Sequence, residues 1–358
     1  MKLFKSLLVA PATLGLLAPL SATANEVTIN DFNPAEELAV TNSRVDGLEA
    51  RLNNFEAGGF SDTTVASFSV DAVLGATDGA TKETTSLDYQ FNIGLSTSFT
   101  GEDSLDIAID SGSAAASTTG AAFGFDTGTS LKVDGVTYSF PLGGATMVVG
   151  DSTDISATYT GACTYSSFTD YTPDDCGTGN SLGVGGTGTT ATLGYAFDSG
   201  FSLAGGVSTT PDEILGDNTD IIGVEAAYNA DGYGVALAYV TNDGGTGDET
   251  TFWGVNGYYT FDLASLSVGF ETSDDGTEKS GYFVGLSFPE VGPGSVNVAA
   301  ATFNGTDGLF ADTDTEYLVY EASYSYPMND GMTLTPGVFI KEGTTDETGV
   351  AVKASFSF

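Results

Sequence analysis

From Thr64 to the C-terminus the sequence alternates apolar and polar side chains with a period of two, and no helical stretch interrupts it. Successive side chains of a β-strand point to opposite faces of a sheet, so this period predicts strands along the whole region. Leu105, Ile107 and Ile109, for example, alternate with Asp106 and Asp110. We expect an all-β protein, a transmembrane antiparallel barrel of about 16 strands.

Two local irregularities stand out within this pattern. The outward-facing positions change from odd to even residue numbers between Val133 and Val136, which suggests a β-bulge at Asp134-Gly135. Pro336 lies inside an expected strand, where it cannot donate a ladder hydrogen bond. The less regular strands are expected around Leu131, Tyr138 and Ile155.

The connections between the expected strands alternate in length. Short turns fall at residues 100–102, 141–145, 198–200, 229–232, 262, 289–293 and 327–331. Longer polar loops fall between them, at residues 112–128, 160–189, 209–218, 242–249, 273–278, 304–315 and 342–347. Short turns at one end and long loops at the other are typical of outer-membrane barrels.

Aromatic residues gather beside the short turns, where an interfacial girdle of a membrane barrel should lie. They are Tyr195, Phe197, Phe201, Tyr228, Tyr233, Tyr259, Phe261, Phe288 and Tyr326, and Phe358 ends the last alternating strand. A soluble β-sandwich also buries aromatic rings, but it has no reason to concentrate them at one end.

Charged residues within the expected strands fall opposite the apolar face. If the apolar face meets lipid, this set lines a water-filled lumen; the alternative is the solvated face of a soluble sheet. The predicted pore-lining residues are Asp71, Asp88, Asp106, Asp110, Lys132, Glu225, Glu271, Glu321 and Lys353. The barrel has no Arg, and its only basic residues are Lys82, Lys132, Lys279, Lys341 and Lys353, so we expect a preference for cations.

Cys163 and Cys176 are the only cysteines of the chain, and a disulfide across one loop is their simplest arrangement in an exported protein.

The chain contains no His, which argues against a zinc site, a catalytic triad and enzymatic activity in general. We expect no cofactor and no metal, although Asp307, Asp312, Asp314 and Glu316 could ligate calcium on an external loop. A formal charge of -39 excludes nucleic acid as a partner and is also compatible with a salt-adapted surface.

The N-terminal region divides into two predicted segments. Residues 1–24 have the pattern of a signal peptide, with Lys2 and Lys5 before an apolar stretch and a small-residue cleavage site. Residues 25–59 contain a helical heptad pattern between Ala35 and Glu56, which predicts a periplasmic coiled coil or a lone amphipathic helix. The barrel is then expected over residues 60–358.

The junction of these segments resembles a known family. Residues 37–52, ELAVTNSRVDGLEARL, followed by FSDTT at 60–64, resemble the cyanobacterial Som-type porins of the carbohydrate-selective porin superfamily. The resemblance implies a sixteen-stranded barrel, a homotrimer and a C-terminal aromatic residue read by the assembly machinery. The interval 25–34 is too short for the family's S-layer-homology domain, so peptidoglycan anchoring is not expected.

The resemblance also implies a role for the loop at residues 160–189, the one after the fifth strand. In such porins this loop folds inward and narrows the pore. Here the expected constriction carries Asp170, Asp174 and Asp175, and the Cys163–Cys176 disulfide would hold its width. The alternative is an outward loop that the disulfide protects from proteolysis.

The sequence thus favours an outer-membrane porin for passive diffusion of ions and small polar solutes, surrounded by outer-membrane lipid. The alternative is a secreted or outer-membrane acidic β-rich structural or adhesion protein without an open pore.

Overall fold

The computed structural model describes residues 64–79, 84–113, 118–125, 128–172, 176, 188–210, 219–243, 249–274, 278–303, 317–343 and 346–358. These residues form sixteen strands. The strands are β1 (Thr64–Asp78), β2 (Thr84–Thr97), β3 (Ser104–Gly112), β4 (Lys132–Leu142), β5 (Ala145–Asp151), β6 (Thr189–Ala196), β7 (Phe201–Thr210), β8 (Thr219–Ala230), β9 (Tyr233–Asn242), β10 (Thr250–Thr260), β11 (Ser265–Asp274), β12 (Glu278–Val291), β13 (Gly294–Phe303), β14 (Tyr317–Asn329), β15 (Met332–Lys341) and β16 (Glu347–Ser357).

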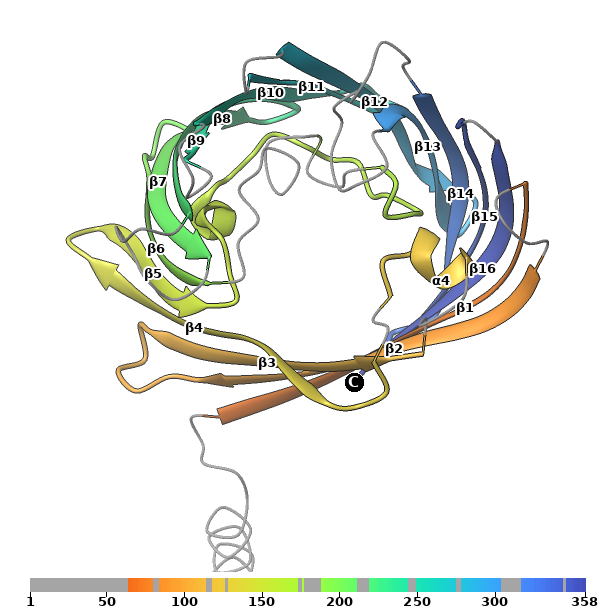
Figure 1. The fold of residues 1–358 in the computed structure, drawn as a ribbon, viewed down its shortest axis with the longest axis horizontal. Coiled ribbons are helices and arrows are strands. Elements are labelled where there is room, and N and C mark those ends of the chain that lie inside the picture. The colour runs from red at the N-terminus through yellow and green to blue at the C-terminus, as the bar shows by residue number, and fades with distance from the viewer. Residues whose placement is uncertain are drawn as a thin grey trace, which may run out of the picture. The chain divides into compact units, whose positions relative to one another are not determined.

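Every strand pairs antiparallel with its neighbours in sequence, and β1 pairs with β16, which closes the barrel (Figure 1). The seam continues to the end of the chain, because the Phe68 amide donates to the Phe358 carbonyl at 2.9 Å and the Phe358 amide donates back at 3.0 Å. The two rings stack with their centroids 6.0 Å apart. Closure leaves no free sheet edge, and it confirms the predicted barrel.

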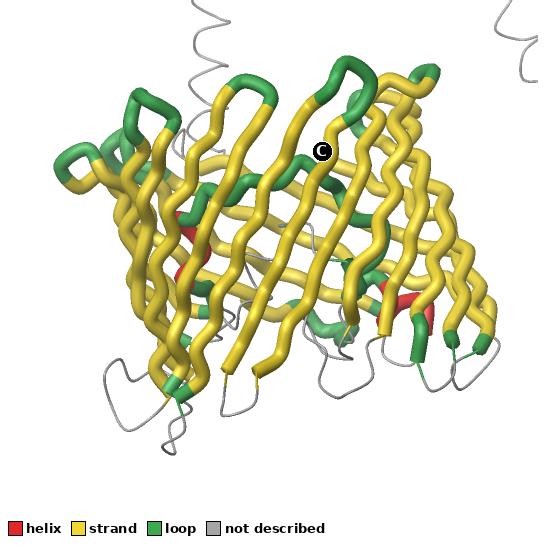
Figure 2. The backbone as a smooth tube through the Cα atoms, turned by 90° about the horizontal axis from the view of Figure 1, so that it is seen from above, coloured by secondary structure: helices red, strands yellow, loops and turns green. Residues whose placement is uncertain are grey.

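The connections alternate as the sequence predicted. Tight turns join β2 to β3, β4 to β5, β6 to β7, β8 to β9, β10 to β11, β12 to β13 and β14 to β15, and they lie at one end of the barrel (Figure 2). The outward aromatic residues beside these turns pack in pairs, such as Tyr195 with Phe197 and Tyr259 with Phe261, at centroid distances of 4.6 and 4.8 Å.

The structure corrects the expected strands between residues 131 and 155. Leu131 and Tyr138 do not mark two strands, because a single strand, β4, begins at Lys132 and includes Tyr138. Ile155 begins a short 3₁₀ helix, η2 (Ile155–Thr158), and its side chain is fully buried. The fifth strand lies earlier than expected, at β5, which ends at Asp151 and is only seven residues long. The bulge is confirmed, because Ala108 pairs with Gly135 and Ile109 pairs with Val133, so Asp134 has no partner across the ladder.

The outer surface of the wall is apolar, unlike the surface of a soluble protein, and many inward-facing residues are buried. On β9, Val235 and Leu237 face outward with 49% and 48% exposure, whereas Ala236, Ala238 and Val240 face inward with at most 1%. An outer surface of this kind is stable only against lipid or another apolar surface. No helix within the described residues is long and apolar enough to span a membrane. The predicted signal peptide and coiled coil lie outside the described residues.

The turn between β2 and β3 is held together by one carboxylate, Asp103. Its Oδ1 accepts from the amides of Phe99 and Thr100 at 2.9 and 2.8 Å, and from the Ser98 hydroxyl at 2.8 Å. Its Oδ2 accepts from the Tyr138 hydroxyl at 2.6 Å. The Tyr138 hydrogen bond, together with those from the turn, holds the pKa of Asp103 well below its usual value.

We therefore expect Asp103→Asn to lower the urea midpoint at neutral pH. Because the folded-state pKa of Asp103 is lowered, its contribution is complete above the unfolded pKa of about 3.9 and is lost as the pH falls further. The difference between the two proteins should shrink below about pH 4. Urea titrations across this range test it, with Glu102→Gln in the same turn as control; a difference independent of pH would contradict this role.

Candidate functional site: a loop seated inside the barrel

The segment after β5 turns into the barrel and follows its inner wall (Figure 1). Residues 152–172, here called the inner loop, begin at β6, where the Thr190 hydroxyl donates to the Thr153 carbonyl at 2.8 Å. The hydroxyls of Thr158 and Thr192 lie 2.6 Å apart. Ile155 then packs with Ile221, Ala238 and Val240 in a buried cluster whose other members all belong to the wall.

Beyond β8 the inner loop lies over two neighbouring rows of inward-facing residues, each row running across the strands from one ladder partner to the next. The first row is Asn229, Gly234, Tyr258, Ser267, Gly285, Ala299, Glu321, Phe339 and Gly349. The second row is Ala227, Ala236, Asn256, Gly269, Phe283, Ala301, Val319, Lys341 and Glu347. Half of the members are Gly, Ala or Ser, and three of the polar ones, Asn256, Ser267 and Glu321, accept from backbone amides of the loop.

The first half of this crossing is held by polar side chains on β8, β10 and β11. The amides of Thr160 and Gly161 donate to the Glu225 carboxylate at 2.7 and 3.2 Å. The Ala162 amide donates to Asn256 Oδ1 at 3.0 Å, and the Thr164 amide donates to Ser267 Oγ at 3.1 Å. Each wall residue thus accepts from the loop backbone as it passes.

Glu321 on β14 is the most heavily used acceptor. Its Oε1 accepts from the Tyr165 hydroxyl at 2.7 Å and the Phe168 amide at 2.8 Å, and its Oε2 accepts from the Thr169 amide and hydroxyl at 2.9 and 2.7 Å. Burial, reinforced by the Glu321 charge, raises the pKa of Tyr165 above its usual value, so its phenol stays protonated and donates. With four hydrogen bonds, the buried carboxylate is well compensated for its lost hydration.

The end of the inner loop is fastened at β15 and β16. The Tyr171 ring packs edge-on against Phe339, and the Lys341 ammonium lies 4.1 Å above the centroid of the Tyr171 ring. Lys341 also forms an ion pair with Glu347 at 3.6 Å, so the positive charge of this lysine is compensated.

Two further contacts fix the loop. A disulfide joins Cys163 to Cys176, and Cys176 is fully buried beside the wall at Gly269. The Asp170 amide donates at 2.9 Å to the carbonyl of Ala122, the last residue of the short helix α4 (Thr118–Ala122), which lies between β3 and β4 in sequence. The connections after β3 and after β5 therefore meet inside the barrel.

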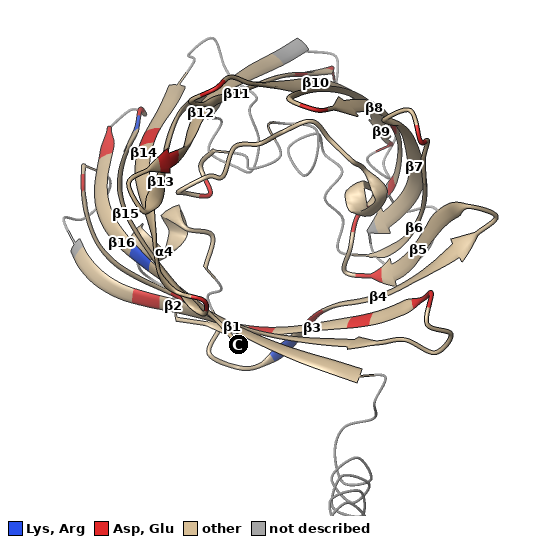
Figure 3. Cartoon of the chain, turned by 180° about the vertical axis from the view of Figure 1, so that it is seen from behind, with Lys and Arg blue, Asp and Glu red and all other residues tan. Residues whose placement is uncertain are grey.

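The predicted pore-lining residues separate into two groups. Asp71, Asp106, Lys132 and Lys353 lie on β1, β3, β4 and β16 and are partly or fully exposed, so both acidic and basic residues occur on this side of the barrel (Figure 3). Five others are buried, with exposures of 0–7%: Asp88, Asp110, Glu225, Glu271 and Glu321. The expectation that all nine face water therefore needs correction for these five. Glu225 and Glu321 face inward, but the inner loop covers them because its amides require acceptors.

The remaining predicted residues are only partly described. Ser166 and Asp170 are exposed residues of the inner loop, whereas Tyr165 and Phe168 pack against the wall. Thr164 is exposed as well, but its hydroxyl lies 3.0 Å from Ser267 Oγ on the wall. Asp174 and Asp175 lie outside the described residues, as do the four candidate calcium ligands at 307–316.

Sequence reasoning missed several loop anchors, namely Asn229, Asn256, Ser267 and Glu347. Asn229 donates its side-chain amide to the Gly161 carbonyl at 2.9 Å. The available signal was a polar residue at an inward strand position, such as Ser267 between the apolar residues Leu266 and Val268. Without the path of the loop, that signal looks the same as a lumen-facing residue.

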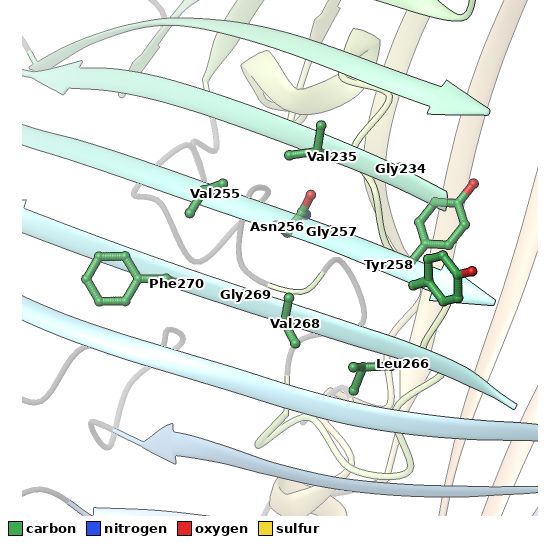
Figure 4. Close-up of a pocket in the computed structure, with 11 residues that line it drawn as sticks. Gly234, Val235, Val255, Asn256, Gly257, Tyr258, Leu266, Val268, Gly269 and Phe270 are labelled. Atoms are coloured by element: carbon green, nitrogen blue, oxygen red, sulfur yellow. The ribbon is translucent and has the colours of Figure 1, made fainter. Parts of the chain in front are cut away.

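An apolar recess of about 420 Å³ lies on the outer side of β9, β10 and β11. Gly257 leaves a gap there between Val235, Val255 and Val268 (Figure 4). Val235 and Val255 are outward residues with 49% and 38% exposure, so this recess belongs to the outer wall and not to the lumen.

The chain resembles solved outer-membrane proteins in structure. OprB of Pseudomonas putida matches with a TM-score of 0.64 and 12% identity, over 83% of this chain and 94% of that one. A loop-deleted OmpT of Vibrio cholerae matches with a TM-score of 0.59 and 10% identity, over 83% and 100%. A triple mutant of Rhodopseudomonas blastica porin matches with a TM-score of 0.54 and 17% identity, over 82% and 100%.

These likenesses show that the chain shares their fold, a closed antiparallel β-barrel. No protein-family model matches the chain, and no curated protein matches it significantly in sequence.

We expect Glu321→Ala to loosen the inner loop. The two amides and two hydroxyls that donate to Glu321 would lose their acceptor. Each donor that stays buried without water would lower the stability of the protein by about 1–3 kcal/mol. The free energy of unfolding in liposomes should fall and open-channel current noise should rise. Ser323→Ala, the next inward position on β14, is the control. Unchanged noise and unchanged stability would show that Glu321 does not hold the loop.

Proposed function

We propose that this protein is a porin of a bacterial outer membrane, a passive channel for ions and small polar solutes. The observation that carries the proposal is the inner loop, which is fixed along one side of the barrel by wall side chains and leaves Ser166 and Asp170 exposed. A loop seated on the wall narrows the lumen without filling it. A barrel with a purely structural or adhesive role has no need of such a device.

We further propose that the channel prefers cations. Among the described pore residues, Asp71, Asp106 and Asp170 are partly or fully exposed acids, Lys132 and Lys353 are partly or fully exposed bases, and Lys341 is paired with Glu347. Lys132 lies opposite Asp110 in the β3–β4 ladder, so it stands beside an acid as well. A surplus of negative charge along a narrow, water-filled path raises the local concentration of cations.

Diffusion, and not sugar binding, is the transport mode that we favour. The rings of Tyr165, Phe168 and Tyr171 are packed against Phe283, Phe123 and Phe339, so a solute cannot stack on the aromatic faces of the inner loop that the structure describes. Sugars would then pass by size, as other small polar solutes do. The resemblance to Som-type porins supports sugars as solutes, and liposome swelling with a graded series of sugars tests this.

The trimer is also a proposal, and it rests on the heptad pattern between residues 35 and 56 and on the same family resemblance. Current steps that open and close in threes would support it.

The first experiment on function is conductance of the purified full-length protein in a planar bilayer under a salt gradient. We expect stable open steps and a reversal potential of the sign for cation preference. Asp106→Asn should lower the cation-to-anion permeability ratio, and Lys132→Gln should raise it, because each changes the lumen charge by one unit in opposite directions. Glu102→Gln, in the β2–β3 turn, is the control.

Two outcomes would overturn these proposals separately. A wild-type reversal potential that favours anions would exclude the selectivity but not the channel. No open steps from folded, membrane-inserted protein would exclude the channel and favour a closed barrel with an adhesive or structural role.

A further inference from the structure

The inner loop lies unusually close to the wall at a few inward-facing glycines. A methyl group at Gly285 would lie 2.5 Å from Cδ2 of Tyr165 and 2.7 Å from Cζ of the wall residue Phe283. A methyl group at Gly337 would lie 2.6 Å from two ring carbons of Phe168. Carbon atoms in favourable contact are about 3.5–4.0 Å apart. Only glycine therefore allows these two rings to rest directly on the backbone of β12 and β15.

We propose that Gly285 and Gly337 are positioning residues that set the width of the pore. Any larger residue at either position would displace the inner loop by about 1 Å, the difference between these distances and a normal contact. The inference rests on the proposed channel. It adds that two glycines covered by the inner loop, and so not in contact with the solute, determine which solutes fit through the pore.

The loop, and not the wall, should yield. The wall on this side is a continuous ladder in which β12 and β15 are each hydrogen-bonded on both sides, so a local bend would disturb several strands. The inner loop is held by side chains alone across β8 to β14, and these can reorient.

The geometry of the crossing also favours movement toward the axis. From Asn229 on β8 to Phe339 on β15 the wall extends over seven strand spacings, roughly 34 Å at about 4.8 Å each. The ten residue-to-residue steps from Gly161 to Tyr171 reach roughly 33–36 Å when fully extended, so the loop has little slack along the wall. A path nearer the axis of a curved wall is shorter, so displacement into the lumen does not stretch the chain.

Glu321 makes the effect of the two glycines a joint one. It shares a ladder row with Gly285 through Ala299, and its carboxylate binds both Tyr165 and the Phe168 amide. The loop around Tyr165 and Phe168 therefore rests on Gly285 on one side of Glu321 and on Gly337 on the other. Displacement at either glycine moves the part of the loop that Glu321 holds.

The test is the pore size of Gly285→Ala, Gly337→Ala and the double variant, measured with single-channel conductance and with the exclusion limit for polyethylene glycols of graded size. We expect lower conductance and a smaller exclusion limit in each single variant, and the largest change in the double variant. Gly257→Ala is the matched control, because Gly257 faces the outer recess (Figure 4) and its added methyl group would approach only the Gly234 carbonyl closely, at 3.0 Å.

A second variant separates positioning from general damage to the fold. Phe168→Ala removes the ring that meets Gly337, so Gly337→Ala should reduce the exclusion limit in the wild-type background and leave it unchanged in the Phe168→Ala background. A loss of stability alone would not depend on Phe168 in this way.

Three results would overturn the inference. Folded Gly285→Ala and Gly337→Ala proteins with wild-type conductance and exclusion limit would show that the loop adapts without narrowing the pore. The same change in both Phe168 backgrounds would show that the effect does not pass through that ring. A change of equal size in Gly257→Ala would show that any substitution in the wall has it. A silent wild-type protein is a different result, because it would reject the channel itself.

Discussion

The interior of this barrel is organised by the hydrogen-bonding needs of one loop. In a closed barrel the backbone groups of every strand are already paired with the neighbouring strands, so the wall can offer a passing chain only its side chains. The inner loop brings a series of backbone amides to that wall and cannot leave them unpaired where water is excluded. Inward-facing Glu225, Asn256, Ser267 and Glu321 meet this need strand by strand.

The same need explains why the acidic residues of the wall have two different roles. Where the loop covers the wall, a carboxylate serves as a backbone acceptor and is removed from water. Elsewhere on β1, β3, β4 and β16, Asp71, Asp106, Lys132 and Lys353 remain partly or fully exposed and can act on passing ions. The charge of the chain is therefore a poor guide to the charge of the pore, because part of it is committed to structure.

Apolar packing in the interior also depends on the inner loop. The four buried clusters each combine a residue of the inner loop with inward-facing residues of the wall. The loop residues are Ile155, Ala162, Tyr165 and Phe168. The result is a protein whose buried cores lie between loop and barrel, while its outer surface stays apolar for lipid. Pore shape and interior stability thus depend on the same contacts.

The strand pattern could be predicted from sequence because each outward residue alternates with an inward one and lipid penalises any slip of register. Prediction failed at β5 and Ile155, where a short strand and a 3₁₀ turn present the same few apolar residues. The inward orientation of Glu225 and Glu321 was also predictable, but their burial beneath the inner loop was not. Burial of an inward residue depends on a loop more than sixty residues away in sequence, and no local pattern encodes that contact.

The most direct test of this account is the distance between the inner loop and the opposite wall in the membrane-inserted protein. Spin labels at Ser166→Cys and Ala108→Cys, both at exposed positions, would report it by double electron-electron resonance. The account predicts one narrow distance distribution, shorter than the width of the barrel, in wild-type background and a broader one when Glu321 is replaced by Ala. A broad distribution in the wild-type background, or distances that place Ser166 outside the barrel, would contradict it.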